Sequence, residues 1–428
     1  MRKDFKVSKY NYIFSYDGDA FVFNTFSGGL SKLSSDAQAI LENFDDYLGD
    51  LTPLHHQMIN NGFLVAADID EFKILECLRM KMISQSTKAI YEILPTTACN
   101  ARCFYCFESS LKPVNMTLET ADKVCDFIIE QAADNQKAIG IHWFGGEPLL
   151  NPKVISHITA RLDKELGKKG VQLSYQMTTN GSLFDDQLIQ KAKNDWHISK
   201  IQITLDGTKK VYEERKNYYN LPNSFEKVIH NINELSANGI RVGIRLNIDE
   251  ENIDDLVELV NYLGKELKHK PYVMCYGYPL FGENSSPDER KNALLLLKLN
   301  DAILANNLST SKSIFSFKFV ECKCYACSLH SFLINADGKI GKCSLALNDS
   351  NSFIGNVFEP LRLTTNYLKW CSPSLRAECK VCLFLPLCQG GCAAGHLGYG
   401  PVKHYIYRNC FDDVLRNYVK YLQSHQTK

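Results

Sequence analysis

The positions of the cysteines constrain this chain more than any other feature of its sequence. The chain has 428 residues, and 16 of them are cysteines. Three cysteines lie between Cys99 and Cys106, and most of the others lie between Cys322 and Cys410. No secretion signal is apparent, and the cytosol keeps thiols reduced, so a disulfide framework is not expected. Clusters of this kind predict sites that bind a metal or a redox centre.

Composition excludes several classes of partner. Lys plus Arg and Asp plus Glu number 48 each, so no net field attracts nucleic acid or a membrane surface. The basic N-terminus lacks the apolar run of a signal peptide, and no stretch is long and apolar enough to span a bilayer. We therefore expect a cytoplasmic protein without a nucleic-acid or membrane partner.

Residues 1–88 predict a small separate module. Aromatic, strand-like runs at 10–16 and 21–25 are joined by Asp17-Gly18-Asp19, which is typical of a hairpin turn. Helices are then expected from Ser34 and over 53–61. A hairpin with short helices indicates a winged-helix-like module. A simple cap over the end of a barrel is the alternative.

Residues 89–290 alternate strands with helices. Repeated βα units imply a parallel sheet, either open or closed into a barrel. In such barrels the chemistry lies at the carboxyl ends of the strands, where the conspicuous motifs of this chain fall. The expected strands cover residues 139–144, 171–177, 200–205, 241–248 and 272–278.

Residues 291–428 form the third expected part. A leucine-rich bridging helix covers 291–310. The remainder has few long periodic segments, so we expect a small fold organised by its metal sites. Four cysteines outside the motifs are expected to be buried apolar residues: Cys77, Cys125, Cys275 and Cys371.

The first cysteine motif is CxxxCxxC, formed by Cys99, Cys103 and Cys106. Three thiolates on one loop can hold three irons of a 4Fe–4S cube and leave the fourth iron open. Zinc is the ordinary alternative, but a structural zinc requires four ligands, and this loop holds no fourth cysteine or histidine. The open iron could chelate the amino and carboxylate groups of an exogenous ligand.

This motif resembles the signature of the radical S-adenosylmethionine (SAM) superfamily, in which an aromatic residue, here Tyr105, precedes the last cysteine. The segment GGEP at 145–148 follows a strand, as it does in that family. There it contacts the methionine end of SAM. The resemblance implies this role for Gly145, Gly146 and Glu147, with Glu147 accepting a hydrogen bond from the SAM amino group.

Two later strands carry polar residues on one face, which is unusual for central parallel strands unless they line a site. The resemblance implies that Asn180, Thr204, Arg245 and Asn247 help to bind the ribose and carboxylate of SAM. Arg245 has a physical case of its own, because a guanidinium suits a carboxylate. Ordinary hydrogen bonding inside a barrel is the alternative.

The second cysteine region resembles the SPASM domain, which carries two auxiliary 4Fe–4S clusters and brings the expected total to three. Along the chain, the motif consists of Cys327, Gly338 and Cys343, followed by a CxxC pair at Cys379 and Cys382. Three further cysteines come after this pair: Cys388, Cys392 and Cys410. A pair of zinc knuckles is the alternative. The implied ligands are Cys379, Cys382, Cys388 and Cys410 for the outer cluster, and Cys327, Cys343 and Cys392 for the inner one, with Cys322, Cys324 or neither as its fourth.

Together these resemblances imply a partial (β/α)6 TIM-type barrel in an α/β fold, between a winged-helix-like module and a SPASM domain. The implied activity is reductive cleavage of SAM to a 5′-deoxyadenosyl radical that removes a hydrogen from the substrate. A flavodoxin or ferredoxin would supply the electron.

Most SPASM enzymes act on peptides. We therefore expect a maturase that installs a thioether, C–C or C–O cross-link in a ribosomally made precursor peptide (RiPP maturation), whose leader binds the N-terminal module. The alternatives are a formylglycine-forming enzyme of the sulfatase-maturing type, a small-molecule radical SAM enzyme, and a non-catalytic iron–sulfur electron carrier. No catalytic residue is predicted.

Overall fold

The computed structural model describes residues 4–44, 50–84, 87–132, 136–280, 289–308, 317, 324–371, 375–400, 405 and 407–425. Cys322, one of the two candidates for the fourth inner ligand, lies outside these residues. Among the helices that are described, none is long and apolar enough to cross a membrane.

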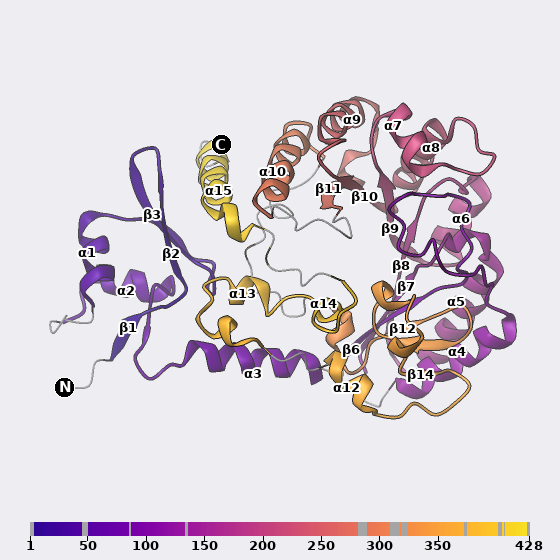
Figure 1. Cartoon of the computed structure of the whole chain (residues 1–428), viewed down its shortest axis with the longest axis horizontal. Coiled ribbons are helices and arrows are strands. Elements are labelled where there is room, and N and C mark those ends of the chain that lie inside the picture. Colours follow the sequence, from indigo (N-terminus) through magenta and orange to yellow (C-terminus); the bar gives the residue numbers. More distant parts are fainter. Residues whose placement is uncertain are drawn as a thin grey trace.

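A curved sheet of parallel strands forms the centre of the molecule (Figure 1). Its strands lie in the order β11-β10-β9-β8-β7-β6, each parallel to its neighbours. The expected α/β class and parallel sheet are therefore confirmed. The strands are β6 (Lys88–Ile93), β7 (Ala138–Trp143), β8 (Gln172–Thr179), β9 (Ile198–Leu205), β10 (Arg241–Ile248) and β11 (Val273–Pro279).

Helices between these strands cover the outer face of the sheet (Figure 1). In the first of them, Ala121, Val124 and Ile128 are buried at helical spacing, and they belong to the same apolar core as Val242 and Ile244 of β10. Full burial of a Val or Ile side chain contributes about 1.5–3 kcal/mol, so this layer sets which strand residues face outward. The helices are α4 (Leu118–Gln131), α5 (Pro152–Gly167), α6 (Asp186–Asn194), α7 (Lys209–Lys216), α8 (Ser224–Ala237) and α9 (Ile253–Glu266).

The cysteine-rich end of the chain continues this sheet. After α10 (Glu289–Ala305), β12 (Phe332–Ile334) pairs in parallel with β6. Two short antiparallel strands, β13 (Lys339–Gly341) and β14 (Gly355–Asn356), extend the edge. The barrel and the C-terminal region therefore share one hydrogen-bonded sheet.

Residues 4–84 contain the expected hairpin, formed by β2 (Asn11–Tyr16) and β3 (Asp19–Asn24). Asp17 and Gly18 both have positive φ, 51° and 78°, as a two-residue type I′ turn requires. The strand β4 (Leu30–Lys32) pairs with β3. The other elements are β1 (Phe5–Val7), β5 (Leu64–Ala66), α1 (Ser35–Asn43), α2 (Pro53–Asn60) and α3 (Glu71–Ser84).

A long C-terminal helix, α15 (Phe411–His425), lies beside this hairpin (Figure 1). Phe14 and Phe23 of the hairpin share an apolar cluster with Phe411 and Val414 of the helix. This helix is one long periodic segment in a C-terminal region where few were expected. Its buried residues recur at helical spacing, and they cover the N-terminal sheet rather than a metal site.

Candidate functional site

The three cysteines of the CxxxCxxC motif lie on the loop after β6, at the carboxyl edge of the sheet. Thr97 anchors the start of the loop, because its hydroxyl donates to the Lys112 carbonyl oxygen at 2.7 Å. The Cys106 N–H donates to the Cys103 carbonyl oxygen at 3.1 Å, which turns the loop back. Burial, together with the Glu147 carboxylate and the neighbouring Cys103 and Cys106 thiols, raises the pKa of Cys99 to about 11. The loop therefore brings the three thiols into one neighbourhood.

This arrangement can be tested against the two candidate metal centres. In the described part of the chain, no three His, Cys, Asp or Glu side chains surround a common point as the ligands of one metal ion do. A structural zinc requires four such ligands. A 4Fe–4S cube binds each cysteine on a different iron, so its ligands are spaced around the cube. Three partly exposed thiols on one loop fit that requirement.

A buried ion pair supports the cysteine loop. Lys216, at the end of α7, lies 3.1 Å from the Asp206 carboxylate, and these side chains are only 4% and 0% exposed. Lys216 also donates to the Tyr105 hydroxyl at 2.8 Å, and Tyr105 donates to Asp206 at 2.5 Å. Burial alone would lower the pKa of Lys216, but the Asp206 carboxylate holds it well above its usual value. Lys216 is therefore a cation bound directly to the aromatic residue of the motif.

The backbone of the same residue holds the loop at a second point. The Lys216 carbonyl oxygen accepts a hydrogen bond from the Arg102 N–H at 3.0 Å. Three residues further on, the Tyr219 N–H donates to the Asn100 carbonyl oxygen at 2.9 Å. The end of α7 and the residues after it thus bind the first half of the cysteine loop through both side chain and backbone.

The two glycines of the GGEP segment lie against the chain that enters the cysteine loop. A Cβ atom on Gly145 would lie 2.4 Å from the Thr96 carbonyl oxygen, and one on Gly146 would lie 2.3 Å from the Ala98 carbonyl oxygen. Both distances are too short for any side chain. Gly145 also has a φ of 107°, which favours glycine. The glycines therefore allow the GGEP segment to pack backbone to backbone against this chain.

The Glu147 carboxylate points into the protein. Its oxygens accept hydrogen bonds from the Thr179 hydroxyl at 2.8 and 2.9 Å, the Asn180 N–H at 2.8 Å and the Leu149 N–H at 3.0 Å. Burial raises the pKa of Glu147 to about 7, although these hydrogen bonds lower it. Glu147 therefore holds the end of β8. Its expected hydrogen bond to the SAM amino group stays a prediction.

Thr204, Arg245 and Asn247 occupy one face of two neighbouring strands. Thr204 on β9 is the register partner of Arg245 on β10. Arg245 donates from Nε to the Asn247 side-chain oxygen at 2.8 Å, and its guanidinium lies 3.7 Å from the centre of the Tyr278 ring. Asn180, at the end of β8, donates to the Asn100 side chain of the cysteine loop at 2.8 Å. The expected polar residues thus lie toward the carboxyl ends of consecutive strands.

A second group of thiols forms around Cys343. Burial, together with the nearby Cys324 and Cys392 thiols, raises the pKa of Cys343 to about 12. Cys327 lies on the same short helical turn as Cys324, at Tyr325–Cys327, and its N–H donates to the Cys324 carbonyl oxygen at 3.2 Å. Cys324, the described candidate for the fourth inner ligand, is therefore beside the other three.

A third group contains Cys379, Cys382 and Cys388. Burial raises the pKa of Cys379, and the neighbouring Cys388 and Cys382 thiols raise it further. Cys410 is buried in the cluster that contains Leu387, the residue before Cys388. The structure thus separates the described motif cysteines into three groups.

Three of the four remaining cysteines, Cys125, Cys275 and Cys371, are buried as expected. The expectation for Cys77 is wrong, because its side chain is exposed on α3. The apolar character of Cys77 was not sufficient to predict burial, because α3 buries only the face that carries Glu71 and Leu75.

Sequence reasoning missed a hydrogen-bonded pair on β6 and β7. His142 Nδ1 lies 3.1 Å from the Glu92 carboxylate, and the other Glu92 oxygen accepts from the Tyr325 hydroxyl at 2.9 Å. Besides burial, the Glu92 carboxylate raises the pKa of Cys343 and also the pKa of Glu108. Glu108 lies two residues after Cys106, the last cysteine of the CxxxCxxC motif. The pair therefore lies near Cys343 and near Glu108. The only advance signal was polar residues at alternate positions in otherwise apolar strands.

A comparison with protein families identifies the central domain. The model of the radical SAM superfamily matches residues 93–263. The chain carries a radical SAM domain. This match contains the cysteine loop, the GGEP segment and the polar faces of β9 and β10. Radical SAM domains use a 4Fe–4S cluster and SAM.

Two further comparisons extend this result. The radical SAM cyclopropyl synthase TigE of Paramaledivibacter caminithermalis is 22% identical over 440 residues, covering 91% of this chain and 90% of TigE. Some other curated relatives are matched over only about half of their own length.

Among solved structures, anSMEcpe with bound AdoMet and the Cp18Cys peptide has a TM-score of 0.63 at 16% identity, covering 79% of this chain and 99% of that one. Streptococcus suis SuiB bound to precursor peptide SuiA has a TM-score of 0.55 at 15% identity, covering 91% and 95%. At these identities the likeness shows the fold that these radical SAM proteins share.

Proposed function

We propose that this chain is a radical SAM maturase that oxidatively cross-links a ribosomally made precursor peptide. The observation that carries the proposal is that Glu92 is an electrostatic neighbour both of Cys343 and of Glu108, which lies two residues after Cys106. One thiol group lies on the cysteine loop of the radical SAM domain, and a second lies around Cys343. A substrate between them would face a radical source on one side and an electron acceptor on the other.

Each thiol group fits one 4Fe–4S cluster. With SAM bound, a cluster held by the first group would supply the radical chemistry that removes a hydrogen from the substrate. A reductant such as a flavodoxin or ferredoxin would provide the electron. The proposed ligands are Cys99, Cys103 and Cys106 for the first cluster, Cys324, Cys327, Cys343 and Cys392 for the inner auxiliary one, and Cys379, Cys382, Cys388 and Cys410 for the outer one.

Several groups of the chain would bind and orient the substrates. The Arg245 guanidinium, which contacts Asn247 and Tyr278, would bind the SAM carboxylate, and the backbone of Gly145 and Gly146 would contact its methionine end. Glu92 and His142 would accept the proton that the substrate loses on oxidation. Their mutual hydrogen bond and the Tyr325 hydroxyl hold them in place.

The relatives support a peptide as the substrate class. SuiB has been solved with the precursor peptide SuiA, and anSMEcpe with the Cp18Cys peptide. TigE is named a radical SAM cyclopropyl synthase, so carbon–carbon bond formation belongs among the candidate products. Formylglycine formation is the second candidate, because a cysteine-type anaerobic sulfatase-maturating enzyme of Clostridium novyi is 22% identical over 333 residues, covering 69% of this chain and 84% of that enzyme.

The proposal is tested on anaerobically reconstituted protein. We expect about twelve irons per chain, corresponding to three 4Fe–4S clusters, and formation of 5′-deoxyadenosine on reduction with dithionite. Co-expression with short peptides encoded beside the gene should then yield one peptide that has lost two hydrogen atoms. Zinc in place of iron, with SAM unchanged, would contradict the proposal. An aldehyde on a single Cys or Ser would favour formylglycine formation.

We further propose that the leader of the precursor adds a strand to the outer edge of β4, with which no other described strand pairs. The opposite edge of this sheet, β2, is partly occupied by α15, because Arg416 donates to the Ser15 carbonyl oxygen at 3.0 Å. On the side of β4 that faces β3, the Leu33 N–H donates to the Ala20 carbonyl oxygen, and the Gly29 carbonyl oxygen accepts from the Asn24 N–H. By alternation, Ser31 faces β3 and the backbone N–H of Lys32 points outward.

Replacing Lys32 with proline should therefore block leader binding. Proline removes the outward N–H without removing a bond to β3, and edge strands tolerate it. We expect peptide modification to fall at least about tenfold while uncoupled cleavage of SAM continues, equivalent to about 1.4 kcal/mol of binding. Lys32→Ala is the matched control, since it also breaks the ion pair with Asp19 but keeps the N–H. Equal loss in both variants would refute pairing at this edge.

A further inference from the structure

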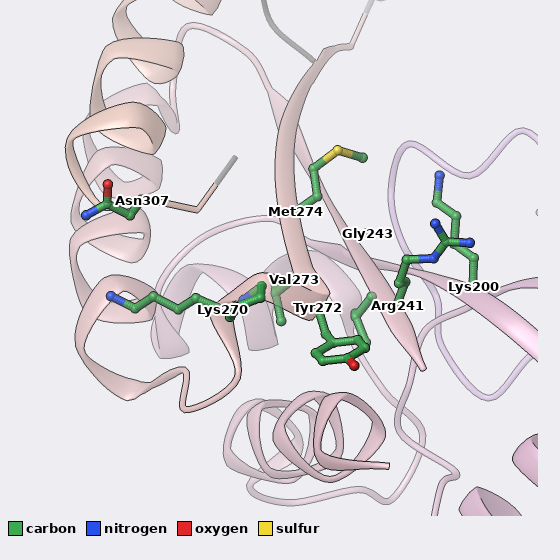
Figure 2. Close-up of a pocket in the computed structure, with 10 residues that line it drawn as sticks. Lys200, Arg241, Gly243, Lys270, Tyr272, Val273, Met274 and Asn307 are labelled. Carbon is green, nitrogen blue, oxygen red and sulfur yellow. The ribbon is translucent and has the colours of Figure 1, made fainter. Parts of the chain in front are cut away.

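A hollow opens at the amino ends of β9, β10 and β11 (Figure 2). The cysteine loop follows β6 and so lies at the opposite, carboxyl edge of the parallel sheet. Its volume is about 540 Å³, within the range of small-molecule sites. Gln202 on β9 is the register partner of Gly243, which lines the hollow, and Tyr276 on β11 is the register partner of Arg245. The Tyr276 hydroxyl donates to the Gln202 side chain, so this hydrogen bond joins the layer of the hollow to the Thr204–Arg245 layer. None of the residues that line the hollow is among the expected SAM contacts.

The hollow has an uncompensated cationic corner. Lys200 and Arg241 are register partners on neighbouring strands, and Figure 2 shows both side chains on the same side of the hollow. Lys270 extends on the opposite side. No Asp or Glu is among the residues lining the hollow, and no ion pair joins these three cations to any described carboxylate. Like charges opposite one another on adjacent strands are unfavourable, so this corner favours an anion.

The rest of the hollow is apolar and includes an aromatic ring. Tyr272 is 44% exposed, and Val273 and Met274 continue the wall beside it. Gly243 leaves the floor between Lys200 and Tyr276 without a side chain, although a Cβ there would meet only ordinary contacts at 3.6 Å. The lining therefore suits a ligand that combines a flat ring with a negative charge.

We infer that this hollow binds a small aromatic anion of the mononucleotide class. Its phosphate lies on Lys200 and Arg241, because a guanidinium fork and an ammonium together match phosphate oxygens. Its ring lies against Tyr272, whose exposed face is available for stacking.

The test is isothermal titration of guanosine 5′-monophosphate (GMP) into the reconstituted full-length chain with SAM present, so that the SAM site is filled. We expect GMP to bind, and the double variant Lys200→Met/Arg241→Met to weaken it at least about tenfold. The double variant Lys193→Met/Lys227→Met changes net charge equally at two exposed lysines outside the hollow, and should bind GMP as wild type does.

A second variant separates the ring from the phosphate. Tyr272→Ala removes an exposed side chain, so folding should be unaffected, and it should weaken GMP but not inorganic phosphate. The inference is overturned if wild type does not bind GMP, or if Lys200→Met/Arg241→Met binds it equally well. Equal affinities of wild type for phosphate and GMP would overturn the assignment of an aromatic ligand.

Discussion

Replacing Cys99, Cys103 and Cys106 together with alanine is expected to abolish cleavage of SAM and to leave about eight irons per chain. The three thiols lie in one neighbourhood on one loop, and the thiols around Cys343 and Cys379 form separate groups. The loss should therefore be confined to one cluster. Iron content, together with 5′-deoxyadenosine after reduction with dithionite, measures both parts of the expectation.

Cys77→Ala is the control for this experiment. Cys77 is exposed on α3 and belongs to none of the three thiol groups. It should keep all of the iron and all of the cleavage activity. Cleavage that survives in the triple variant would defeat the assignment of the CxxxCxxC loop as the SAM-cleaving centre.

Replacing Lys216 with methionine is expected to destabilise the protein by about 3–5 kcal/mol, because it leaves the Asp206 charge buried without its cation. Both side chains are almost completely buried, and Lys216 also holds Tyr105. The midpoint of urea unfolding in the absence of SAM measures the loss. The cysteine loop should also become more accessible to proteolysis, since Tyr105 loses a hydrogen-bond donor.

Two variants make this result interpretable. Lys191→Met breaks the ion pair with Asp195 on exposed α6, where a loss of about 0–1 kcal/mol is expected. Combining Lys216→Met with Asp206→Asn should recover part of the stability, because no unpaired charge is then buried. If Lys216→Met costs no more than Lys191→Met, the buried pair does not support the fold.

Local signals in the sequence predicted several elements correctly. Asp17-Gly18 marked a two-residue hairpin turn, and Ser34 caps α1 through a hydrogen bond to Ala37. The apolar alternation from Arg241 to Ile248 matches the bounds of β10. Each of these depends on neighbours close in the chain, which is why pattern and turn chemistry were sufficient.

Features set by distant contacts were not predictable. No local sequence pattern singles out Lys216, because its role depends on contacts with Asp206 and Tyr105, which lie on two other loops. Glu92 and His142 acquire meaning only from the pairing of β6 with β7 and the return of Tyr325. The cysteine spacings predicted sets of cluster ligands, but they gave no sign of the Glu92–His142 pair.

The pairing of β12 with β6 has a consequence for biosynthesis. The partner of Tyr91 is Phe332, so the edge of β6 stays open until more than half of the chain has been made after it. An unpaired apolar strand edge is a template for aggregation, and long-range parallel pairing is slow. The nascent chain therefore depends on its last quarter to close the sheet. A chain truncated before residue 332 should therefore aggregate during synthesis. It should not yield a soluble barrel that lacks only its auxiliary clusters.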